Sequence, residues 1–371
     1  MLLRFLLFLI LSFLITASLC KTKPPPQEEE FLEPVNVSNT PGASYHLAIA
    51  GDSKGTVHLV WCDETPGNEE IFYAYKPKGG LWSTPVDISN NPWCSRFPCI
   101  AVDKNDVIHL AWQNSSAGRW RIFYSRKAPE SSWSIPETIT GEWDYVVPKL
   151  AVDSIGNVHL AWSYGGYYSG IRYTMRTNDG FWLPQMTVAE RALNCDPAIA
   201  VDNQGNVHLI WAKVKDDYTG VDILYSMKSG NGGWSSPEII RSHPTGHDVS
   251  ICVDNQENII CVWDDDTPPP EKPDAFYREK RADGTWTNPA PVCTSSYVMI
   301  YEPSLAKGPA GELYLAGARR HKEGGKCDLL YLTKPSGRNW SDTLICGVTR
   351  EEPYTIWARA LAVIMKVSYI L

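Results

Sequence analysis

The sequence lacks an excess of positive charge. Its 371 residues include 34 Lys and Arg against 42 Asp and Glu, which gives a formal net charge of −8 at pH 7. Nucleic-acid-binding domains generally present a basic face, and adhesion to an anionic membrane surface requires clustered Lys and Arg. The composition therefore argues against a nucleic-acid partner and gives no support for electrostatic attachment to a membrane.

Zinc-binding patterns and long apolar runs are also missing. The ten cysteines and eight histidines form no Cys-x-x-Cys pair and no His/Cys cluster, so no zinc site is predicted. The apolar run at 5–15 is too short for a transmembrane anchor, and the terminal run at 355–371 is interrupted by Arg359 and Lys366. We expect that terminal run to form a packed pair of strands.

The first twenty residues have the pattern of an export signal. Arg4 is followed by an apolar core and then by the small residues Ala17 and Ser18. Cys20 lies where a bacterial lipoprotein carries its acylated cysteine, but the preceding Leu19 is not the Gly or Ala usual there. Lipidation of Cys20 and plain cleavage next to it are the two alternatives. Both predict an extracytoplasmic protein, either secreted or attached to the cell envelope, with a lipid on Cys20 as its only membrane contact.

The cysteine spacing does not predict a small disulfide scaffold, although ten cysteines suit an exported protein. Cys94 and Cys99 flank a loop and could pair with each other or with Cys62. Cys252 and Cys261 fall on the two arms of one predicted hairpin, near each other but not directly opposite. The alternative is that several of these cysteines are small buried hydrophobes.

The sequence is rich in aromatic residues and turn formers, with 15 Trp, 18 Tyr, 27 Gly and 27 Pro. These residues are typical of β structure with frequent tight turns. The stretch Ala200–Trp211 predicts a strand, a turn at 202–205 and a second strand. The same pattern recurs at 50–61, 101–112, 151–162 and 252–263.

Two markers give the period of this repeat. The third strand of each unit centres on a tyrosine, at Tyr73, Tyr124, Tyr173, Tyr225, Tyr277 and Tyr331. A turn with a tryptophan follows, at Trp82, Trp133, Trp182, Trp234, Trp286 and Trp340. Both series advance by 51, 49, 52, 52 and 54 residues. About fifty residues and four strands per unit indicate an all-β fold, a β-propeller of four-stranded blades.

The predicted organisation is a signal peptide at 1–20, a Pro/Glu-rich tether at 21–33 and a single β-propeller domain at 34–371. Six repeats are complete. A strand-like segment at Pro34–Val37 and the residues after Glu352 predict a partial seventh blade built from both termini. A six-bladed ring with surplus terminal strands is the alternative. We expect the protein to be a monomer.

The repeated residues are expected to support the fold. His58, His109, His159 and His208 recur at one position of the second strand, where later copies have Ile260 and Tyr314. A residue that isoleucine can replace in a sister blade is not expected to be catalytic. We therefore predict that these histidines form hydrogen bonds between blades.

Two turns carry a family resemblance. The segments 177–182 (Thr-Asn-Asp-Gly-Phe-Trp) and 282–286 (Ala-Asp-Gly-Thr-Trp) resemble shortened copies of the Asp box, Ser-x-Asp-x-Gly-x-x-Trp. That motif caps the turn between the third and fourth strands in sialidase-type propellers of bacteria. The resemblance implies the fold, and it implies an active site on the face opposite these turns.

The candidate site lies in the loops that do not repeat, because function on a repeated scaffold concentrates in such loops. Just before the first strand of four successive units come Asp196, Asp248, Glu302 and Glu352. Clustered carboxylates suit glycoside hydrolysis and equally a bound Ca²⁺, or they cap loop backbone. No catalytic residue is assigned, and the candidates are Asp196, Asp248, Glu302 and Tyr301. The ligand-binding candidates are Trp93, Arg96, Trp143, Asp144, Tyr145, Arg191 and Glu352.

Three functions are compatible with this pattern. The first is a non-catalytic exported propeller that binds a glycan or a protein through its loop-rich face. The second is a sialidase-like glycoside hydrolase, for which the resemblance implies three arginines, a Tyr–Glu nucleophile pair and an acidic Asp. Arg96, Arg191 and Arg350 could supply the arginines, and Tyr301 and Glu302 the pair, but the family's Arg-Ile-Pro signature is missing. The third is a scaffold for partner proteins. No cofactor other than Ca²⁺ is considered.

Overall fold

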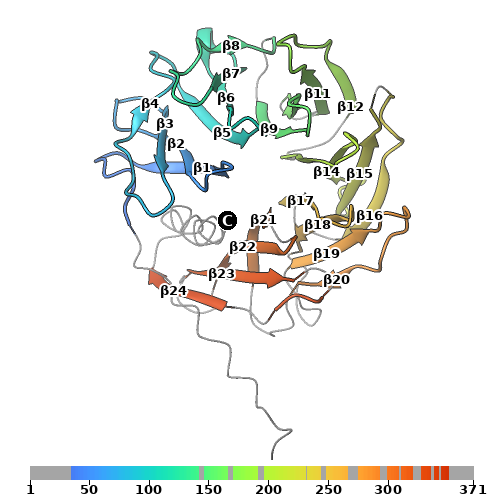
Figure 1. Cartoon of the computed structure of the whole chain (residues 1–371). Helices are drawn as coiled ribbons and strands as arrows, with labels where there is room; N and C mark the ends of the chain where they lie inside the picture. The colour runs from blue at the N-terminus through green and yellow to red at the C-terminus, as the bar shows by residue number, and fades with distance from the viewer. Residues whose placement is uncertain are drawn as a thin grey trace, which may run out of the picture. The chain divides into compact units, whose positions relative to one another are not determined.

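The computed structural model shows six four-stranded antiparallel sheets in the part of the chain that it describes. The described residues are 35–141, 146–165, 170–190, 196–230, 232–243, 248–265, 275–292, 299–308, 311–320, 327–335, 338–341 and 344–350. The sheets are arranged as the blades of a propeller around a central axis (Figure 1). None of the helices in these ranges is long and apolar enough to cross a membrane.

Each of the first three blades consists of four strands that follow one another in the chain. Blade 1 contains β1 (Ser44–Gly51), β2 (Val57–Asp63), β3 (Glu70–Lys76) and β4 (Val86–Asp87). Blade 2 contains β5 (Ser95–Val102), β6 (Ile108–Asn114), β7 (Arg121–Lys127) and β8 (Glu137–Thr138), with the short 3-10 helix η1 (Ser116–Gly118) between β6 and β7. Blade 3 contains β9 (Val146–Val152), β10 (Val158–Tyr164), β11 (Gly170–Arg176) and β12 (Met186–Ala189).

The last three blades repeat this order. Blade 4 contains β13 (Ala198–Val201), β14 (Val207–Val214), β15 (Val221–Lys228) and β16 (Glu238–His243). Blade 5 contains β17 (Val249–Val253), β18 (Ile259–Asp264), β19 (Ala275–Lys280) and β20 (Ala290–Pro291). Blade 6 contains β21 (Met299–Lys307), β22 (Leu313–Arg320), β23 (Cys327–Lys334) and β24 (Leu344–Arg350).

The predicted turn at 202–205 is confirmed. The N–H of Gly205 donates to the carbonyl of Asp202, and the N–H of Asp202 donates to the carbonyl of Asn206. The second strands of blades 1–5 are buried along most of their length, and β2 and β6 are buried throughout. Their tryptophans lie in the core of these five blades, because Trp61, Trp112, Trp162, Trp211 and Trp263 are at most 1% exposed.

The six-bladed alternative matches the described structure, and the seventh blade is not confirmed. Val35, Asn36 and Val37 belong to no strand, which corrects the predicted strand at Pro34–Val37. The reason is local: the side-chain oxygen of Asn36 accepts the N–H of Asn39 at 3.1 Å, and Asn39 has a φ of 46°. This turn prevents an extended conformation, and Val37 packs instead against the core of blade 1. The residues after 350 lie outside the described part of the chain.

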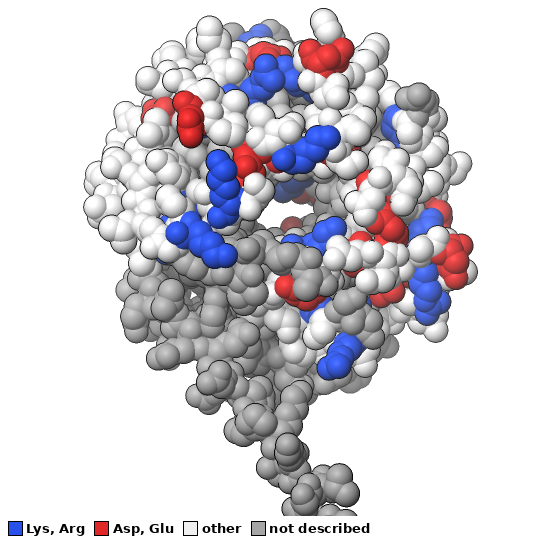
Figure 2. Space-filling view, in the orientation of Figure 1, with Lys and Arg blue, Asp and Glu red and all other residues white. Residues whose placement is uncertain are grey.

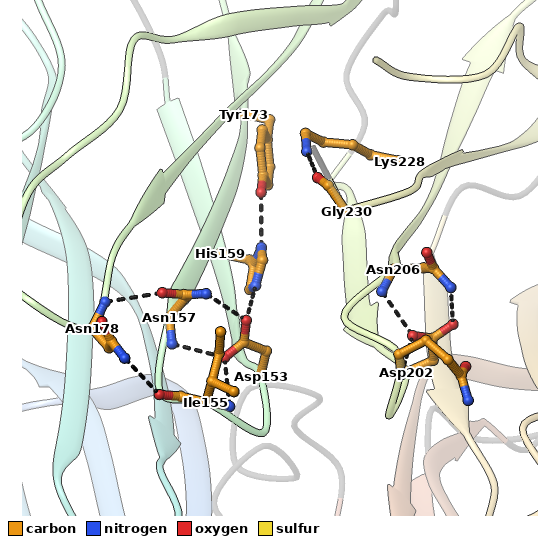
Figure 3. A network of polar contacts seen from close by, with 11 residues as sticks. Asp153, Ile155, Asn157, His159, Tyr173, Asn178, Asp202, Asn206, Lys228 and Gly230 are labelled. Atoms are coloured by element: carbon orange, nitrogen blue, oxygen red, sulfur yellow. Dashed lines mark hydrogen bonds and ion pairs between the residues drawn. The ribbon is translucent and has the colours of Figure 1, made fainter. Parts of the chain in front are cut away.

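Four blades contain a buried chain of polar side chains that links three strands. In blade 3 the Nδ1 atom of His159 lies 2.8 Å from the hydroxyl of Tyr173, and its Nε2 atom lies 3.3 Å from Oδ2 of Asp153 (Figure 3). Oδ1 of Asp153 accepts the N–H groups of Ile155 and Asn157 in the turn. The same contacts join His58 to Tyr73, His109 to Tyr124 and His208 to Tyr225.

The prediction that these histidines bond between blades is therefore wrong. His159 pairs with Met175 and Ala161 pairs with Tyr173 in the β10–β11 register. His159 and Tyr173 are thus diagonal neighbours on one face of the same sheet, close enough for long side chains to meet. A fold-supporting role for the histidines holds, but within each blade.

Contacts between blades are made by the tyrosine rings. The ring of Tyr73 meets that of Trp133 in the next blade, with centroids 5.2 Å apart and an interplanar angle of 83°. Tyr124 with Trp182, Tyr173 with Trp234 and Tyr225 with Trp286 repeat this T-shaped geometry at 5.1–5.2 Å. Edge-to-face packing is the arrangement that aromatic quadrupoles favour. One side chain thus joins the polar chain of its own blade to the next blade.

Cys62, Cys94, Cys99, Cys252 and Cys261 are free thiols. The predicted pairings within this set are therefore absent from the structure. Cys252 pairs with Ile260 across the β17–β18 ladder, so Cys261 is displaced by one residue, as predicted. Cys62, Cys99 and Cys261 are buried, which agrees with their alternative role as small hydrophobes.

The Tyr124→Phe substitution should destabilise the protein by about 1–3 kcal/mol, because it leaves the buried Nδ1 atom of His109 without a partner. The free energy of unfolding from urea titrations measures this effect. Tyr75→Phe on the neighbouring blade is the control, because Tyr75 is 42% exposed and should change stability by less than about 0.5 kcal/mol. Equal effects of the two substitutions would contradict the proposed role.

Stability should also fall as the pH is lowered below about 6.5, the ordinary pKa of histidine. Burial lowers the pKa of His58, His109 and His208, although Asp52, Asp103 and Asp202 partly oppose that change. The unfolded chain therefore takes up protons at a higher pH than the folded protein. Acidification in this window favours unfolding, and the stability present above pH 6.5 is lost towards the lower folded-state pKa.

Urea denaturation at pH 7.5, 6.5 and 5.5 tests this expectation. His208→Ile, which introduces the residue that blade 5 has at Ile260, should flatten the pH profile whatever it does to absolute stability. If the free energy of unfolding of the unaltered protein did not change from pH 7.5 to 5.5, the predicted effect of the buried histidines would be contradicted.

Candidate functional site

The loops that do not repeat meet on one face of the propeller. In blade 1 the loop between β2 and β3 contacts the loop that leads from β4 to β5. The N–H of Ser95 donates to the carbonyl of Glu69, and Nδ2 of Asn68 donates to the carbonyl of Trp93 at 2.8 Å. The Asp-box-like turns lie at the other end of the strands, where Asn178 bonds to Ile155 and Asn157 of the first turn of its blade.

Two neighbouring blades converge on one carboxylate of this loop face. Glu69 accepts a hydrogen bond from the hydroxyl of Tyr45 on one oxygen and forms an ion pair with Nε of Arg96 through the other. Tyr45 in β1 and Arg96 in β5 occupy the same position of the repeat, each seven residues before the turn aspartate. We call Tyr45, Glu64, Glu69, Arg96 and Trp120 the Glu69 cluster.

The rest of the Glu69 cluster extends towards solvent. The Tyr45 hydroxyl oxygen also lies 3.0 Å from Oε1 of the exposed Glu64. The guanidinium of Arg96 lies 5.6 Å from the ring centroid of Trp120 and its side chain is 39% exposed, while Glu69 is only 7% exposed. The cluster therefore presents a cation stacked on an aromatic ring above a buried carboxylate.

The inner strands β1 and β5 each contain a shift of register next to the cluster. The register of β1 with β2 shifts between Tyr45 and Ala48, and that of β5 with β6 shifts between Arg96 and Cys99. His46 and Phe97, which fall in these shifts, have φ values of 49° and 50°. Their rings lie 3.9 Å apart by centroid. Positive φ in non-glycine residues is strained, and such strain is concentrated at functional sites.

The electrostatics of the cluster follow from these contacts. Burial raises the pKa of Glu69, but the bonds from Arg96 and Tyr45 outweigh it and hold that pKa below its usual range. Burial and the neighbouring Glu69 raise the pKa of Tyr45 well above that of a free tyrosine. Burial together with Arg96 lowers the pKa of His46 to about 4. At neutral pH the cluster thus contains an ionised Glu69 and a protonated Tyr45, and the neighbouring His46 is uncharged.

The candidates predicted from the sequence have different outcomes. Arg96 belongs to the Glu69 cluster, and Trp93 is 45% exposed on the adjacent loop. Asp196 lies two residues before the inner strand β13 and Asp248 directly before β17, and the N–H of Asp248 donates to Oδ1 of the buried Asp264. The backbones of Tyr301 and Glu302 belong to β21, and their side chains are not described. The candidates outside the described residues are Cys20, Trp143, Asp144, Tyr145, Arg191 and Glu352.

Sequence reasoning missed Tyr45, His46 and Glu69. His46 and Tyr45 could have been found, because they occupy the places of Phe97 and Arg96 in the first copy of the repeat. Glu69 carries no repeat signal, since its position lies in a loop of variable length.

Among the residues that the structure describes, no group of three or more His, Cys, Asp or Glu side chains is arranged to hold a metal ion. The Ca²⁺ hypothesis depended on four carboxylates, of which Glu302 and Glu352 have no described side chain. It therefore stays a prediction.

Figure 2 shows an opening at the centre of the propeller with Lys, Arg, Asp and Glu side chains next to it.

No protein-family model and no curated protein sequence matches this chain. Solved structures do. A leech intramolecular trans-sialidase in complex with 2,7-anhydro-Neu5Ac has a TM-score of 0.56 at 11% identity, over 80% of this chain and 68% of that chain. An α-L-arabinofuranosidase from Fusarium graminearum has a TM-score of 0.56 at 14% identity, over 84% and 95%. An α-L-arabinanase from Penicillium chrysogenum, complexed with arabinobiose, has a TM-score of 0.53 at 13% identity, over 79% and 91%.

These likenesses confirm the resemblance to sialidase-type propellers as a resemblance of fold. At such low identity they assign no residue and no activity to this chain.

The Arg96→Met substitution should raise the pKa of Glu69, because burial would then be opposed only by the hydrogen bonds of Tyr45 and Cys94. The titration of glutamate side-chain ¹³C signals by NMR measures the shift. Arg126→Met is the control, since Arg126 lies in a different cluster on the turn face. An unchanged Glu69 pKa in Arg96→Met would show that the ion pair does not control this carboxylate.

Proposed function

We propose that this chain is an exported, non-catalytic β-propeller that binds a glycan on its loop face. The single observation that carries the proposal is the Glu69 cluster, in which Arg96 is held by Glu69 beside the ring of Trp120. Sugar rings stack on aromatic faces, and their hydroxyl or carboxylate oxygens accept hydrogen bonds from a guanidinium. Carbohydrate sites generally combine a few such fixed polar groups with aromatic walls.

The chemistry of the cluster favours binding over hydrolysis. Glycoside hydrolysis needs a carboxylic acid that is protonated at working pH, together with a second carboxylate. Glu69 is ionised and both of its oxygens are occupied. Glu70 has a raised pKa through burial, but it is 1% exposed and is enclosed by donors from Asn68, Ser89 and Asn91. It therefore lacks access to a substrate.

A sialidase-like hydrolase is the second candidate, and one observation favours it. The Tyr45 hydroxyl lies between two carboxylates, Glu64 and Glu69, and next to Arg96. A carboxylate beside a tyrosine hydroxyl is a plausible arrangement for removing its proton. The trans-sialidase and arabinofuranosidase named above add fold-level support for sugar chemistry. The raised pKa of Tyr45 opposes its use as a nucleophile.

Export is part of the proposal. It is supported by the charged, apolar and small-residue pattern of the first twenty residues. Secretion and attachment through a lipid on Cys20 are the two forms it could take, and mass spectrometry of the mature protein distinguishes them.

A glycan array probed with the mature protein, together with fluorogenic sialosides and arabinofuranosides, tests the function. We expect binding of at least one glycan class without turnover. Arg96→Met and Trp93→Ala should each weaken that binding by about tenfold or more, because each removes a group that faces the ligand. Phe181→Ala is the control, since Phe181 is an exposed aromatic residue on the turn face, at 68% against 45% for Trp93.

The alternatives give different results in the same experiment. Turnover that is lost in Tyr45→Phe, Asp248→Asn or Glu302→Gln would replace the binding proposal with the hydrolase. The absence of both binding and turnover would reject glycan recognition and favour a protein partner.

A further inference from the structure

On the turn face, an acidic side chain occupies the same place at two of the interfaces between blades. Asp106 of blade 2 accepts the N–H and the hydroxyl of Ser53 in blade 1, both at 2.8 Å. Glu257 of blade 5 accepts the N–H of Asn203 in blade 4 at 3.1 Å and also bonds to its side-chain amide. In both cases the acceptor lies three residues after the turn aspartate of its own blade. The donor lies one residue after the turn aspartate of the preceding blade.

These acidic residues occupy a backbone position that normally favours glycine. Asp106 has a φ of 59° and Glu257 a φ of 62°, whereas the sister positions are Gly55, Gly156, Gly205 and Gly311. An L-residue in this conformation is strained, and the contact across the interface offsets that cost. The scaffold therefore gains from negative charge at this place between two turns.

Between blades 2 and 3 the corresponding acidic group is missing. Gly156 stands where blade 2 has Asp106, and a hollow of about 380 Å³ lies beside it. A Cβ atom added to Gly156 would come no closer than 3.7 Å to Asp103 and Asn178, so there is room for a larger group. The N–H of Lys104 corresponds to those of Ser53 and Asn203, and no carboxylate of blade 3 stands opposite it in the described residues.

The hollow is lined by three cations, Lys104, Arg126 and Arg176. Arg176 is only 5% exposed, and its Nε atom has no hydrogen-bond partner in the described structure. Its nearest carboxylate is Glu137, at 4.0 Å from Nη2. Asp103 is the one acidic residue of the lining. Its Oδ1 accepts the N–H groups of Asn105 and Val107, and its Oδ2 lies 3.5 Å from Nε2 of His109. Two guanidiniums and an ammonium thus line the hollow with a single carboxylate.

The interface between blades 3 and 4 differs from the interface between blades 2 and 3 in its cations. Gly205 of blade 4 also replaces the acidic residue, and Lys228 stands at the place of Arg176. Lys228, however, donates to the carbonyl of Gly230 in its own turn (Figure 3). Blade 3 has Met175 where blade 2 has Arg126, so the second cation is absent. Arg126 is the basic residue at a position where the other blades have Tyr75, Met175, Met227, Glu279 and Thr333.

We propose that the hollow between blades 2 and 3 is a binding site for a tetrahedral oxyanion, a phosphate or sulfate group, held by Arg126, Arg176 and Lys104. The anion takes the place that the carboxylates of Asp106 and Glu257 fill at the sister interfaces. The N–H of Lys104 and Nε of Arg176 donate to it, and the guanidinium of Arg126 closes the exposed side. Arginine is the side chain best suited to such groups, because its planar fork donates two parallel hydrogen bonds.

Isothermal titration of the full chain with inorganic phosphate and with sulfate, at constant ionic strength set by sodium chloride, tests the site. We expect saturable binding of both anions at one site. Arg126→Met introduces the residue that blades 3 and 4 carry and should weaken binding by about tenfold or more, as loss of a charge-assisted hydrogen bond does. Because Arg126 is exposed, this variant should retain the unfolding midpoint of the unaltered protein measured in chloride.

Two further variants separate the site from a nonspecific charge effect. Gly156→Glu supplies the carboxylate that Glu257 provides in blade 5, so it should abolish phosphate binding. Arg176→Lys, which matches the other five blades, should weaken binding while it preserves the fold. Lys228→Met at the neighbouring interface is the control and should leave the affinity for phosphate unchanged.

Methyl phosphate distinguishes the source of the anion. Affinity equal to that of inorganic phosphate would assign the site to an ester-linked group on a larger molecule, and much weaker binding would assign it to the free anion; both results support the site. Absence of binding by phosphate and sulfate would overturn the proposal. Equal affinities in the unaltered protein, Arg126→Met and Gly156→Glu would also overturn it.

Discussion

The tyrosine of the third strand is the side chain on which the ring depends. In blade 2 the hydroxyl of Tyr124 satisfies the buried His109, whose other nitrogen faces Asp103 at the end of the first strand. The ring of the same tyrosine packs against Trp182 of blade 3. The polar pairing that sets the strands of one blade and the aromatic packing that sets the next blade are therefore coupled through one residue. A buried polar group of this kind specifies one arrangement, because a buried histidine without its partners is costly.

The sequence predicts much of this architecture because the period places the tyrosines, turn aspartates and turn tryptophans at equivalent positions. It does not predict which blade a side chain contacts. His159 reaches Tyr173 because of a diagonal relation across one ladder, and that relation depends on the register of β10 with β11. The predicted strand at Pro34–Val37 failed for a different reason. Asn36 closes a local turn with Asn39, and this side-chain interaction outweighs the weak strand pattern of the neighbouring valines.

The candidate site was less predictable than the fold. Arg96 could be named because it is a charged residue in a variable loop, but its partner Glu69 could not. Glu69 meets Tyr45 and Arg96 only because two inner strands and the β2–β3 loop converge in space, and a loop without a repeat gives no register for such a contact. Tyr45 was within reach of the repeat alignment, since it is the first-blade counterpart of Arg96. The carboxylate series from Asp196 to Glu352 stays a prediction, because two of its four side chains are not described.

Comparison of equivalent positions in the six blades also shows which charged residues the fold does not require. Lysine or arginine ends every third strand, so Arg176 alone would be read as part of the blade design, like Lys280 against Tyr225 and Glu238. Arg126 is different, because no sister blade has a basic residue at its position. A guanidinium set beside Arg176 raises electrostatic repulsion, and no fold-wide contact compensates for it. Local departures of this kind are expected where function rather than folding determines the residue. Here Arg126 coincides with the replacement of the acidic residue by Gly156. Arg126 adds a cation to the hollow, and Gly156 leaves the space that an anion would fill.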